Sequence, residues 1–425
     1  MSPERKRLTN IVGGSAGNLV EWFDWYVYAA FALYFKSAFF PEGDDTAQLL
    51  QTAAVFAVGF IMRPIGAWVM GRYADTKGRK SGLTLSVSLM CAGSLAIACA
   101  PTYAQAGVLS PAILLIARMV QGFSLGGEYG SSATYLSEMA GRERRGFWSS
   151  FQYVTLIAGQ LFALALLLLL QASMSEVALE AWGWRIAFAA GAVLAVVVFI
   201  IRRRLTETPS YEKVAASADR KASSAFALFR EHPREAWLVV ALTAGGTLAF
   251  YAYTTYMQKF LANTSGFDRE TASRIMTLAL FVFMALQPLA GALSDRVGRK
   301  PVMIAFGIAG TVLTVPIFTA LESVRDPLAA FALVMGALVM VTGYTSINAV
   351  VKAELFPGHI RALGVALPYA LANTAFGGTA EYVALWLKDA GHERWFYYYV
   401  AATIGLSLIA YLMMRETKRT SLIED

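Results

Sequence analysis

Cysteine and histidine are scarce in this sequence of 425 residues. Its two cysteines, Cys91 and Cys99, lie in one apolar stretch, and its three histidines, His232, His359 and His392, are far apart in the chain. Such spacing contains neither a metal-binding pattern nor a disulfide framework. A GxxxxGKS/T phosphate loop is also missing, which argues against direct hydrolysis of ATP. We therefore expect no cofactor, no bound metal ion and no enzymatic activity.

Charged residues are the second scarce class. They make up 15% of the chain, hydrophobic residues make up 57%, and the mean hydropathy is +0.51. Because about a quarter of the residues in a typical soluble protein are charged, this composition indicates a membrane protein. Twelve apolar stretches reach the length of roughly 20 residues that a membrane-spanning helix needs. These predicted spans are 10–36, 49–70, 81–100, 111–136, 147–170, 182–201, 236–260, 271–293, 301–321, 327–350, 362–387 and 394–414.

The basic residues of the first half lie in alternate loops. Clusters of lysine and arginine precede the first span and follow the second, fourth and sixth spans, at 5–7, 72–80, 142–145 and 202–204. The positive-inside rule therefore predicts that both termini lie in the cytoplasm. Because the net charge of +7 comes from separate loops and not from one soluble basic face, we expect no binding to nucleic acid.

A sequence repeat divides the chain into two similar parts. The segment GRYADTKGRK at 71–80 returns as GALSDRVGRK at 291–300, an offset of 220 residues. A second match, a glutamate followed seven residues later by an arginine, occurs at Glu138 and at Glu354, an offset of 216. Both matches fall in basic loops after even-numbered spans. The repeat predicts two bundles of six helices with the same orientation in the membrane.

The repeat also sets the predicted domain boundaries. We predict an N-terminal six-helix bundle at 1–204, a polar cytoplasmic linker at 205–235 and a C-terminal six-helix bundle at 236–425. The predicted fold class is an all-α membrane protein with twelve transmembrane helices in two parallel-repeat bundles. In transporters built this way, the substrate and the coupling ions bind between the halves, near the middle of the bilayer.

Five charged residues lie away from the ends of the predicted spans of the first half: Glu21, Asp24, Arg63, Arg118 and Glu128. A central charge costs about 2.5–3.5 kcal/mol to insert, so five lipid-facing charges would cost on the order of 12–17 kcal/mol. We therefore expect these side chains to face the interior of the bundle, to pair with one another or to line water.

The two acids of the first span are candidates for proton coupling. Glu21 and Asp24 are three residues apart and so share one helical face, with Tyr28 one turn beyond Asp24. In one interpretation, the acids form buried ion pairs with Arg63 or Arg118 that fix helix packing. In the other, one acid carries a coupling proton, because burial and a nearby second carboxylate both favour the protonated form. Both interpretations remain open at this point.

Arg63 and Arg118 are candidate anion ligands. Arg63 precedes Pro64, which frees a backbone carbonyl group and can bend the helix, so a structural role is equally open. Arg118 lies one turn before Gln121, and glycines follow at every fourth position of 122–130, a spacing that lets another helix approach closely. We interpret the glycines as packing residues, and Arg118 with Gln121 as substrate-binding residues.

The predicted spans of the second half contain more tyrosines and amides than charges. We include Tyr251 among the substrate-binding candidates, together with Tyr28. Lys352 departs from the repeat, because the first half has the apolar Leu136 at the corresponding position. Lys352 is either a substrate-binding cation or a lysine that extends its ammonium group to the membrane surface, and both interpretations remain open.

Several motifs resemble those of the major facilitator superfamily. Its signatures are similar to the repeated loop GxxxDxxGRK and to the RxxQG motif that begins at Arg118. Within the superfamily, GNLVEWFDWYVY, MRPIGAW, QGFSLGGEYG, WGWRIAF and ELFPGHIRALG resemble the metabolite:proton symporter family. The segments TYMQKFLANTSG and FGGTAEYVALWLK resemble its α-ketoglutarate-carrying branch. Sibling branches carry shikimate, citrate, or proline and betaine, and they share the first-half motifs.

The resemblance implies secondary active transport. The expected activity is proton-coupled symport of the dicarboxylate α-ketoglutarate into the cell by alternating access. Symport of another organic acid, such as shikimate or citrate, or of an osmolyte such as proline or betaine, is the alternative. The implied partners are a small organic acid, protons and the lipid bilayer of the inner membrane, and we expect a monomer.

The resemblance also implies a cytoplasmic gate, a latch that holds the two halves together in the outward-open state. A carboxylate beside a helix N-terminus and an arginine form a charge network that can break in water-accessible surroundings. We expect the second-half residues to form the weaker part of this latch. The expected gate residues are Asp75, Gly78, Arg79, Glu138, Arg145, Asp295 and Arg299.

Overall fold

Helices and the turns between them make up the computed structural model, and the described residues include no strand. The described backbone comprises residues 3–41, 43, 45–77, 79–127, 129–203, 225–357 and 360–423. Side chains are not described at 3–17, 71–72, 74–77, 79–83, 131–132, 135, 138–139, 201–203, 225 and 227. The prediction of an all-α protein is confirmed.

The helices divide into a first half, before residue 204, and a second half, after residue 224. The first half contains α1 (Pro3–Phe39), α2 (Asp45–Lys77), α3 (Arg79–Cys99), α4 (Tyr103–Ala106), α5 (Leu109–Gly126), α6 (Tyr129–Met139), η1 (Arg142–Arg144), α7 (Arg145–Ser149), α8 (Phe151–Ser173), α9 (Glu176–Ala178), η2 (Leu179–Gly183) and α10 (Trp184–Arg203). The second half contains α12 (Ala225–Glu231), α13 (Pro233–Tyr253), α14 (Met257–Asn263), α15 (Arg269–Val297), α16 (Arg299–Ser323), α17 (Pro327–Thr345), α18 (Asn348–Glu354), α19 (Arg361–Ala372), η3 (Asn373–Gly377), α20 (Ala380–Asp389), α21 (Glu393–Met413) and α22 (Thr417–Thr420).

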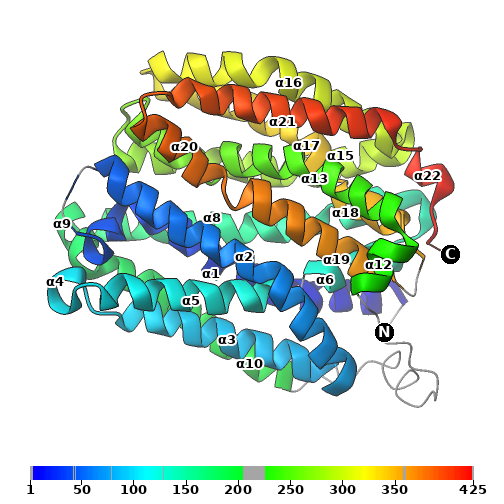
Figure 1. Cartoon of the computed structure of the whole chain (residues 1–425), viewed down its shortest axis with the longest axis horizontal. Coiled ribbons are helices and arrows are strands. Elements are labelled where there is room, and N and C mark those ends of the chain that lie inside the picture. The colour runs from blue at the N-terminus through cyan, green and yellow to red at the C-terminus, as the bar shows by residue number, and fades with distance from the viewer. Residues whose placement is uncertain are drawn as a thin grey trace.

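The long helices run between two ends of the molecule (Figure 1). The short helices α4 and α9 lie at one end, which we call the α9 end, and α12 and α22 lie at the opposite end, which we call the α22 end. In this view α2, α3, α5 and α10 gather in the lower part, and α16, α17, α20 and α21 gather in the upper part. The two halves therefore lie side by side, with a seam between them that runs from end to end.

Every predicted span has a helix in the structure. Nine of the described helical segments are long and apolar enough to cross a membrane. The other three predicted spans correspond to α1, which carries Glu21 and Asp24, to α3, whose described apolar part is Thr84–Cys99, and to α19 with α20.

Five predicted spans contain an interruption of the α-helix, which the span pattern does not mark. The interrupted spans are 111–136 (α5 and α6), 147–170 (α7 and α8), 236–260 (α13 and α14), 327–350 (α17 and α18) and 362–387 (α19 and α20). Apolar residues continue through these breaks, so the hydropathy pattern does not mark them. The breaks matter because each lies next to side chains of the seam.

α2 and α5 cross with their backbones in contact. A Cβ atom at Gly122 would lie 1.8 Å from the carbonyl oxygen of Gly59, and one at Gly126 would lie 2.0 Å from the carbonyl oxygen of Arg63. Only glycine fits at these positions, so the packing interpretation of the glycine series is confirmed. The crossing brings Arg63 of α2 next to α5, the helix that carries Arg118.

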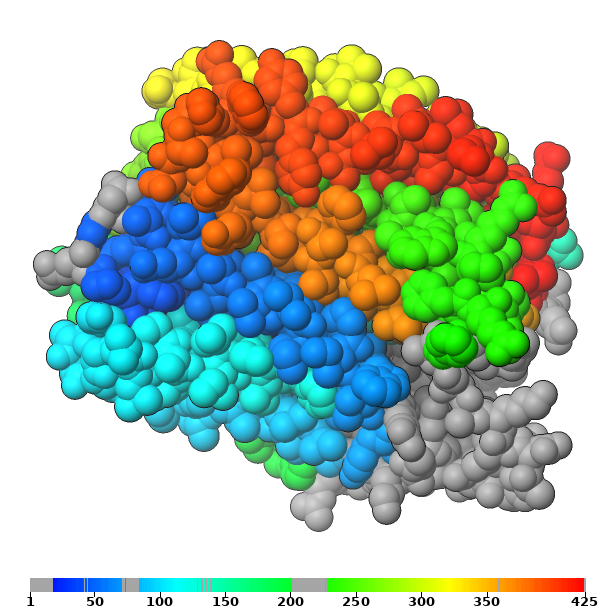
Figure 2. Space-filling view, viewed as in Figure 1, coloured from blue at the N-terminus to red at the C-terminus, as the bar shows by residue number. Residues whose placement is uncertain are grey.

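The two halves meet along several helix pairs. First-half helices contact second-half helices in the pairs α2 with α20, α8 with α15, α6 with α19, and α7 with α15. On the face drawn in Figure 2, the surface of α2 meets that of α19 and α20 without an open groove.

Candidate functional site

Asp24 is the centre of a buried hydrogen-bond network in the first half. Its Oδ2 accepts a hydrogen bond of 2.7 Å from Nε2 of Gln121, and its Oδ1 accepts one from the hydroxyl of Ser94. Gln121 in turn accepts a hydrogen bond of 2.8 Å at Oε1 from Nη1 of Arg118. The side chains of Asp24 and Arg118 are 0% exposed. Gln121 therefore bridges the acid and the arginine, and within the described chain no direct ion pair joins Asp24 to an arginine.

The Trp25 ring lies between the guanidinium groups of Arg63 and Arg118, the two candidate anion ligands. The guanidinium carbon of Arg63 is 4.2 Å from the centroid of the Trp25 ring, and that of Arg118 is 3.9 Å from it. Phe60 adds a second ring 3.9 Å from Arg63, and Tyr28 adds one 4.4 Å from Arg118. Cation–π contacts of this kind stabilise a desolvated guanidinium by about 2 kcal/mol. The aromatic residues thus allow two arginines to lie inside an apolar bundle.

Both arginines have hydrogen-bond donors that no described group accepts. These donors are Nε and Nη2 of Arg63 and Nε and Nη2 of Arg118. Each guanidinium is a rigid fork of N–H groups whose geometry matches a carboxylate. Because an unsatisfied buried donor is costly, this arrangement favours a ligand-binding role over a purely structural one.

The first-span residues lie close to this network. Tyr28 contacts Arg118 with its ring and donates a hydrogen bond of 2.8 Å from its hydroxyl to the carbonyl oxygen of Thr52. Glu21, one turn before Asp24, is 2% exposed. Three of the predicted site residues, Asp24, Tyr28 and Arg118, therefore lie close together, while their roles in transport stay predictions.

Lys352 of α18 is buried at the seam. Its Nζ donates a hydrogen bond of 2.8 Å to Oδ1 of Asn348 and lies 4.0 Å from the ring centroid of Tyr369. Tyr129 of the first half stacks on Tyr369 at a centroid distance of 3.8 Å and also donates to Asn348. The ammonium group thus points to a tyrosine cluster between the halves and not to the membrane surface.

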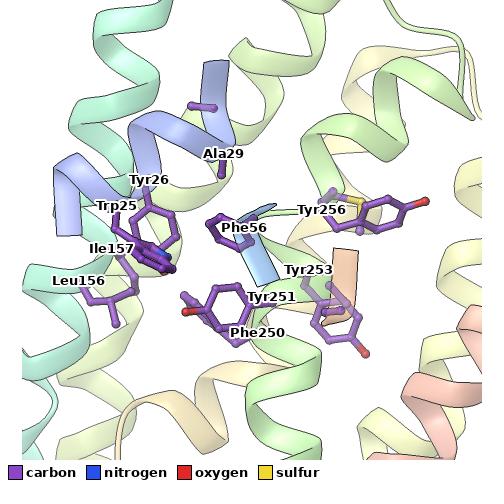
Figure 3. Packing of buried hydrophobic residues seen from close by; sticks show 14 of the residues in the cluster. Trp25, Tyr26, Ala29, Phe56, Leu156, Ile157, Phe250, Tyr251, Tyr253 and Tyr256 are labelled. Atoms are coloured by element: carbon purple, nitrogen blue, oxygen red, sulfur yellow. The ribbon is translucent and has the colours of Figure 1, made fainter. Parts of the chain in front are cut away.

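Side chains fill the centre of the seam. Phe60 contacts Tyr251 at a centroid distance of 5.3 Å, and Tyr153 contacts Phe250 at 5.5 Å. Figure 3 shows Trp25, Tyr26 and Phe56 opposite Phe250 and Tyr251. Tyr251 also lies beside Arg63.

A cavity about the size of one water molecule lies at the same level of the seam, between α1, α8 and the break that precedes α14. It is lined by Tyr26, Ala29, Ala30, Gln160, Leu164, Thr254, Thr255 and Gln258. This cavity is far smaller than the small organic acid that the sequence leads us to expect, so its lining residues must move apart before such a molecule fits there.

Asp295 joins the halves at the α22 end. Its Oδ1 accepts a hydrogen bond of 2.8 Å from the backbone N–H of Gly146, and its Oδ2 accepts one of 2.9 Å from that of Phe147. Arg299 holds the same carboxylate through Nη1 at 2.8 Å. A carboxylate on the first turn of a helix, held by an arginine, is the arrangement that the sequence predicted for the latch.

The C-terminal segment continues this connection. Arg299 also lies 3.6 Å from Oε1 of Glu354. Arg145 of the first half donates to the hydroxyl of Ser421 and to the carbonyl oxygen of Ile423, both at 3.3 Å. Three predicted gate residues, Arg145, Asp295 and Arg299, therefore meet at the α22 end.

The remaining predicted gate residues lie outside the described part of the chain. Residue Gly78 has no described backbone, and the side chains of Asp75, Arg79 and Glu138 are not described. The expectation that these residues form the stronger part of the latch stays a prediction.

We predict that Gly146→Ala favours opening at the α22 end. A Cβ atom at Gly146 would lie 2.4 Å from Oγ of Ser294 and 2.6 Å from the carbonyl oxygen of Gly291, so the closed interface cannot form without a shift. Overpacking of this kind costs about 1–3 kcal/mol. In a background without the native cysteines, labelling of Ala29→Cys by an impermeant maleimide added at the α22 end is expected to become roughly tenfold faster.

The matched control for this variant is Gly141→Ala, because no heavy atom lies within 4 Å of a Cβ at Gly141. Equal labelling rates in Gly146→Ala and Gly141→Ala would contradict the assignment of this contact to the gate.

Arg269 joins the halves at the α9 end. Its Nη1 lies 3.1 Å from Oε1 of Glu176 and forms a closer ion pair with Glu180, both from the first half. Its guanidinium carbon is 5.2 Å from the ring centroid of Tyr34. Sequence analysis did not assign this arginine, because its position at a span end is typical of ordinary interfacial residues.

We predict that Arg269→Ala favours opening at the α9 end. Partly exposed ion pairs are each worth about 0.2–1 kcal/mol, so labelling of Ala29→Cys from the α9 end should rise by a few fold. Arg274→Ala is the control, since Arg274 pairs with Glu270 on its own helix and does not bridge the halves. An unchanged labelling rate in Arg269→Ala would show that this bridge does not hold the α9 end closed.

Sequence reasoning missed two residues of the site. Ser94 of α3 donates to Asp24, and Trp25 separates the arginines. The sequence marks neither of them, because aromatic residues make up 13% of the chain and a single serine in an apolar helix is common.

Comparison with known protein families identifies the family of the chain. Residues 10–235 match the family model described as Sugar (and other) transporter, and residues 258–424 match the model described as Major Facilitator Superfamily. The chain belongs to the major facilitator superfamily. It is a transporter protein with twelve membrane spans, and its fold and relatives are those of transporters and not of enzymes.

Sequence alignments with superfamily members of known activity extend over nearly the whole chain. The α-ketoglutarate permease of Escherichia coli (strain K12) is 55% identical over 413 residues, which are 97% of this chain and 95% of that protein. A citrate-proton symporter of Klebsiella pneumoniae is 31% identical over 96% of this chain and 92% of that protein.

Solved structures of the superfamily share the fold. A partially occluded, inward-open structure of the xylose transporter XylE from E. coli superposes with a TM-score of 0.77 at 18% identity, over 97% of this chain and 98% of that one. The predicted fold class is confirmed by this likeness.

Proposed function

We propose that this superfamily member is a secondary active transporter that carries α-ketoglutarate into the cell together with protons. The observation that carries the proposal is the pair of buried arginines, Arg63 and Arg118, whose unaccepted N–H donors lie at the seam. The 55% identity to an α-ketoglutarate permease supports the choice of substrate.

The cations of the seam suit a substrate with two carboxylates. Arg63 and Arg118 bind them as bidentate donors, which makes each contact stronger than a neutral hydrogen bond. Lys352 supplies a third positive charge from the second half, and Tyr251, beside Arg63, supplies a hydroxyl. Binding by residues of both halves lets the substrate draw the halves together.

Coupling to protons follows from the charge of the substrate. Moving a dianion inward against about 100 mV, interior negative, costs roughly 4.6 kcal/mol, since each charge is worth about 2.3 kcal/mol. Protons that travel with the substrate remove this cost. A carrier of this substrate therefore needs at least one site that binds a proton in the outward-open state and releases it in the inward-open state.

Asp24 is the proposed proton site, with Glu21 as its neighbour on the same helix. The Asp24 carboxylate accepts a hydrogen bond from Gln121, which accepts one from Arg118 in turn. A proton on Asp24 removes one acceptor from this chain, so Gln121 and Arg118 become free to turn towards the substrate. Proton binding and substrate binding thus support each other.

Alternating access follows from the two closed ends. The α22-end contact of Asp295 with Gly146 and the α9-end contact of Arg269 with Glu180 both join the halves. When the contacts at one end break while those at the other end persist, the seam opens to one side of the membrane.

The positive-inside pattern supports an orientation in which the α22 end and both termini face the cytoplasm. We further propose the inner membrane as the location, domains at 1–204 and 236–425 joined by the linker 205–235, and a monomer as the functional unit. The helix α12 lies in the second part of this linker.

The test is reconstitution of the purified protein into liposomes, with uptake of a panel of labelled acids measured with and without an inward proton gradient. We expect accumulation of α-ketoglutarate that depends on the gradient and is reduced by unlabelled α-ketoglutarate. Preference for citrate would move the substrate assignment towards the Klebsiella relative. Preference for proline or betaine would contradict the dicarboxylate assignment.

A further inference from the structure

A second buried charge pair lies in the membrane part of the second half. Nζ of Lys259 is 2.8 Å from Oε2 of Glu381, and the two side chains are 1% and 5% exposed. The mechanism above uses neither residue. Two charges inside the bilayer are costly even when paired, so the pair calls for an explanation beyond packing.

The pair joins the outer segments of two broken helices. Lys259 lies on α14, which follows the break after Tyr253, and Glu381 lies on α20, which follows the π-helical η3. The far ends of the same two segments are also connected, because Nζ of Lys388 donates to the carbonyl oxygen of Asn263 at 3.0 Å. α14 and α20 therefore form one unit at the α9 side of the seam.

This unit faces the substrate site of the first half. Tyr28, whose ring contacts Arg118, is also within electrostatic range of Glu381. α20 packs against α2, and a Cβ at Gly378 would lie 2.4 Å from the Phe60 ring. Opening of the α9 end separates α2 from α20, so it exposes the pair to outer water beside the binding site.

Few other charged groups surround the acid. Tyr28 of α1 and Tyr256 of the turn before α14 face Glu381. α21 contributes Glu393, which lies 3.6 Å from Lys388, and α2 has no titratable residue from 46 to 62. Lys259 is therefore the main counter-charge of Glu381 among the described residues.

We propose that Glu381 is a proton-controlled counter-ion and that Lys259 is a further substrate-binding cation, used on the outward-open side. Outer water delivers a proton to the Glu381 carboxylate, the ion pair opens, and the Lys259 ammonium attracts a carboxylate of the incoming substrate. In the structure the Glu381 carboxylate pairs with Lys259, so the protein closes without an unpaired cation in the bilayer. This inference rests on the proposed function, because it assigns the second pair to the same anionic substrate.

The test compares the outer KM for labelled α-ketoglutarate at outer pH 6 and pH 8, in oriented proteoliposomes with fixed inner pH and clamped potential. In the wild type, KM should rise from pH 6 to pH 8. Glu381→Gln imitates the protonated acid, so its KM at pH 8 should be roughly tenfold below that of the wild type, the usual effect of one charge-assisted contact. Its ratio of KM at pH 8 to KM at pH 6 should fall accordingly.

The double variant Lys259→Met with Glu381→Met, which we call the neutral pair, leaves no unpaired charge. It provides the test if Glu381→Gln fails to insert into the membrane. It should show a KM raised by roughly tenfold at pH 6, with a reduced pH ratio. Glu393→Gln is the matched control, since Glu393 of α21 pairs with Lys388 at the outer end of α20, and it should keep the wild-type ratio.

If both Glu381→Gln and the neutral pair keep the wild-type ratio of KM at pH 8 to KM at pH 6, the proposal is overturned. Lys259 and Glu381 then form a structural contact only. Failure of the wild type to carry α-ketoglutarate is a different result. It would overturn the proposed substrate, and the same KM ratios would then be measured with the acid that the wild type does carry.

Discussion

Arg118→Ala is expected to abolish uptake of labelled α-ketoglutarate, with a loss of at least about 100-fold, and to leave the protein in the membrane. Arg118 is 0% exposed, its Nε and Nη2 have no described acceptor, and its remaining bond goes to Gln121. Loss of two charge-assisted hydrogen bonds to a buried carboxylate accounts for an effect of this size. Uptake rate and membrane abundance would be measured together.

Two variants separate this role from stability. Arg118→Lys keeps the charge but loses the fork of donors, so it should retain only part of the uptake. Arg185→Ala is the matched control, because Arg185 also lies on a tryptophan, Trp184, at 4.3 Å, but donates to the backbone carbonyls of Ala98 and Ala100 within the first half. Normal uptake by Arg118→Ala would remove this arginine from the site.

Asp24→Asn is expected to lose accumulation driven by a proton gradient while it still exchanges substrate across the membrane. Asparagine cannot bind or release a proton, but it can still accept from Gln121 and contact Ser94, the two partners of Asp24. Each coupled proton multiplies the accumulation ratio by about tenfold per unit of pH gradient. Accumulation under a gradient of one unit should therefore fall by about that factor.

Glu21→Gln identifies which acid carries the proton. Exchange of labelled for unlabelled substrate, measured without a gradient, reports that each variant still binds and translocates. If Asp24→Asn accumulates substrate as the wild type does and Glu21→Gln does not, the coupling role belongs to Glu21. If both variants accumulate normally, neither acid couples transport to protons.

The span pattern could be predicted from the sequence because lipid imposes a strong constraint on composition. Each predicted span has a helix, and the repeated loop at 291–300 lies at the end of α15 and the start of α16, as expected. The breaks in five spans could not be predicted, because the residues around Thr254 or Gly378 are as compatible with a helix as their neighbours. Packing between helices decides where the backbone turns.

The charged residues of the site could be found because charge inside a membrane is rare. Asp24, Arg118 and Gln121 were identified one by one, and the structure joins them in one chain of hydrogen bonds. The residues that complete the site are of common types. Ser94 and Trp25 become identifiable only when α3 and α5 are placed beside α1.

Lys352 shows what three-dimensional context adds to a single residue. The sequence left it either at the membrane surface or at the substrate, and the structure places its ammonium group against Tyr369 at the seam. Lys259 was not identified, since it lies near a predicted span end, where lysine is frequent. Its burial against Glu381 follows from the break before α14, which the hydropathy pattern does not contain.

The most direct test of proton-coupled transport through these buried charges is the pH inside proteoliposomes when α-ketoglutarate is added outside. The wild type should acidify the interior in step with uptake of the labelled substrate, and Arg118→Ala should do neither. Uptake of α-ketoglutarate by the wild type without any acidification would contradict the account.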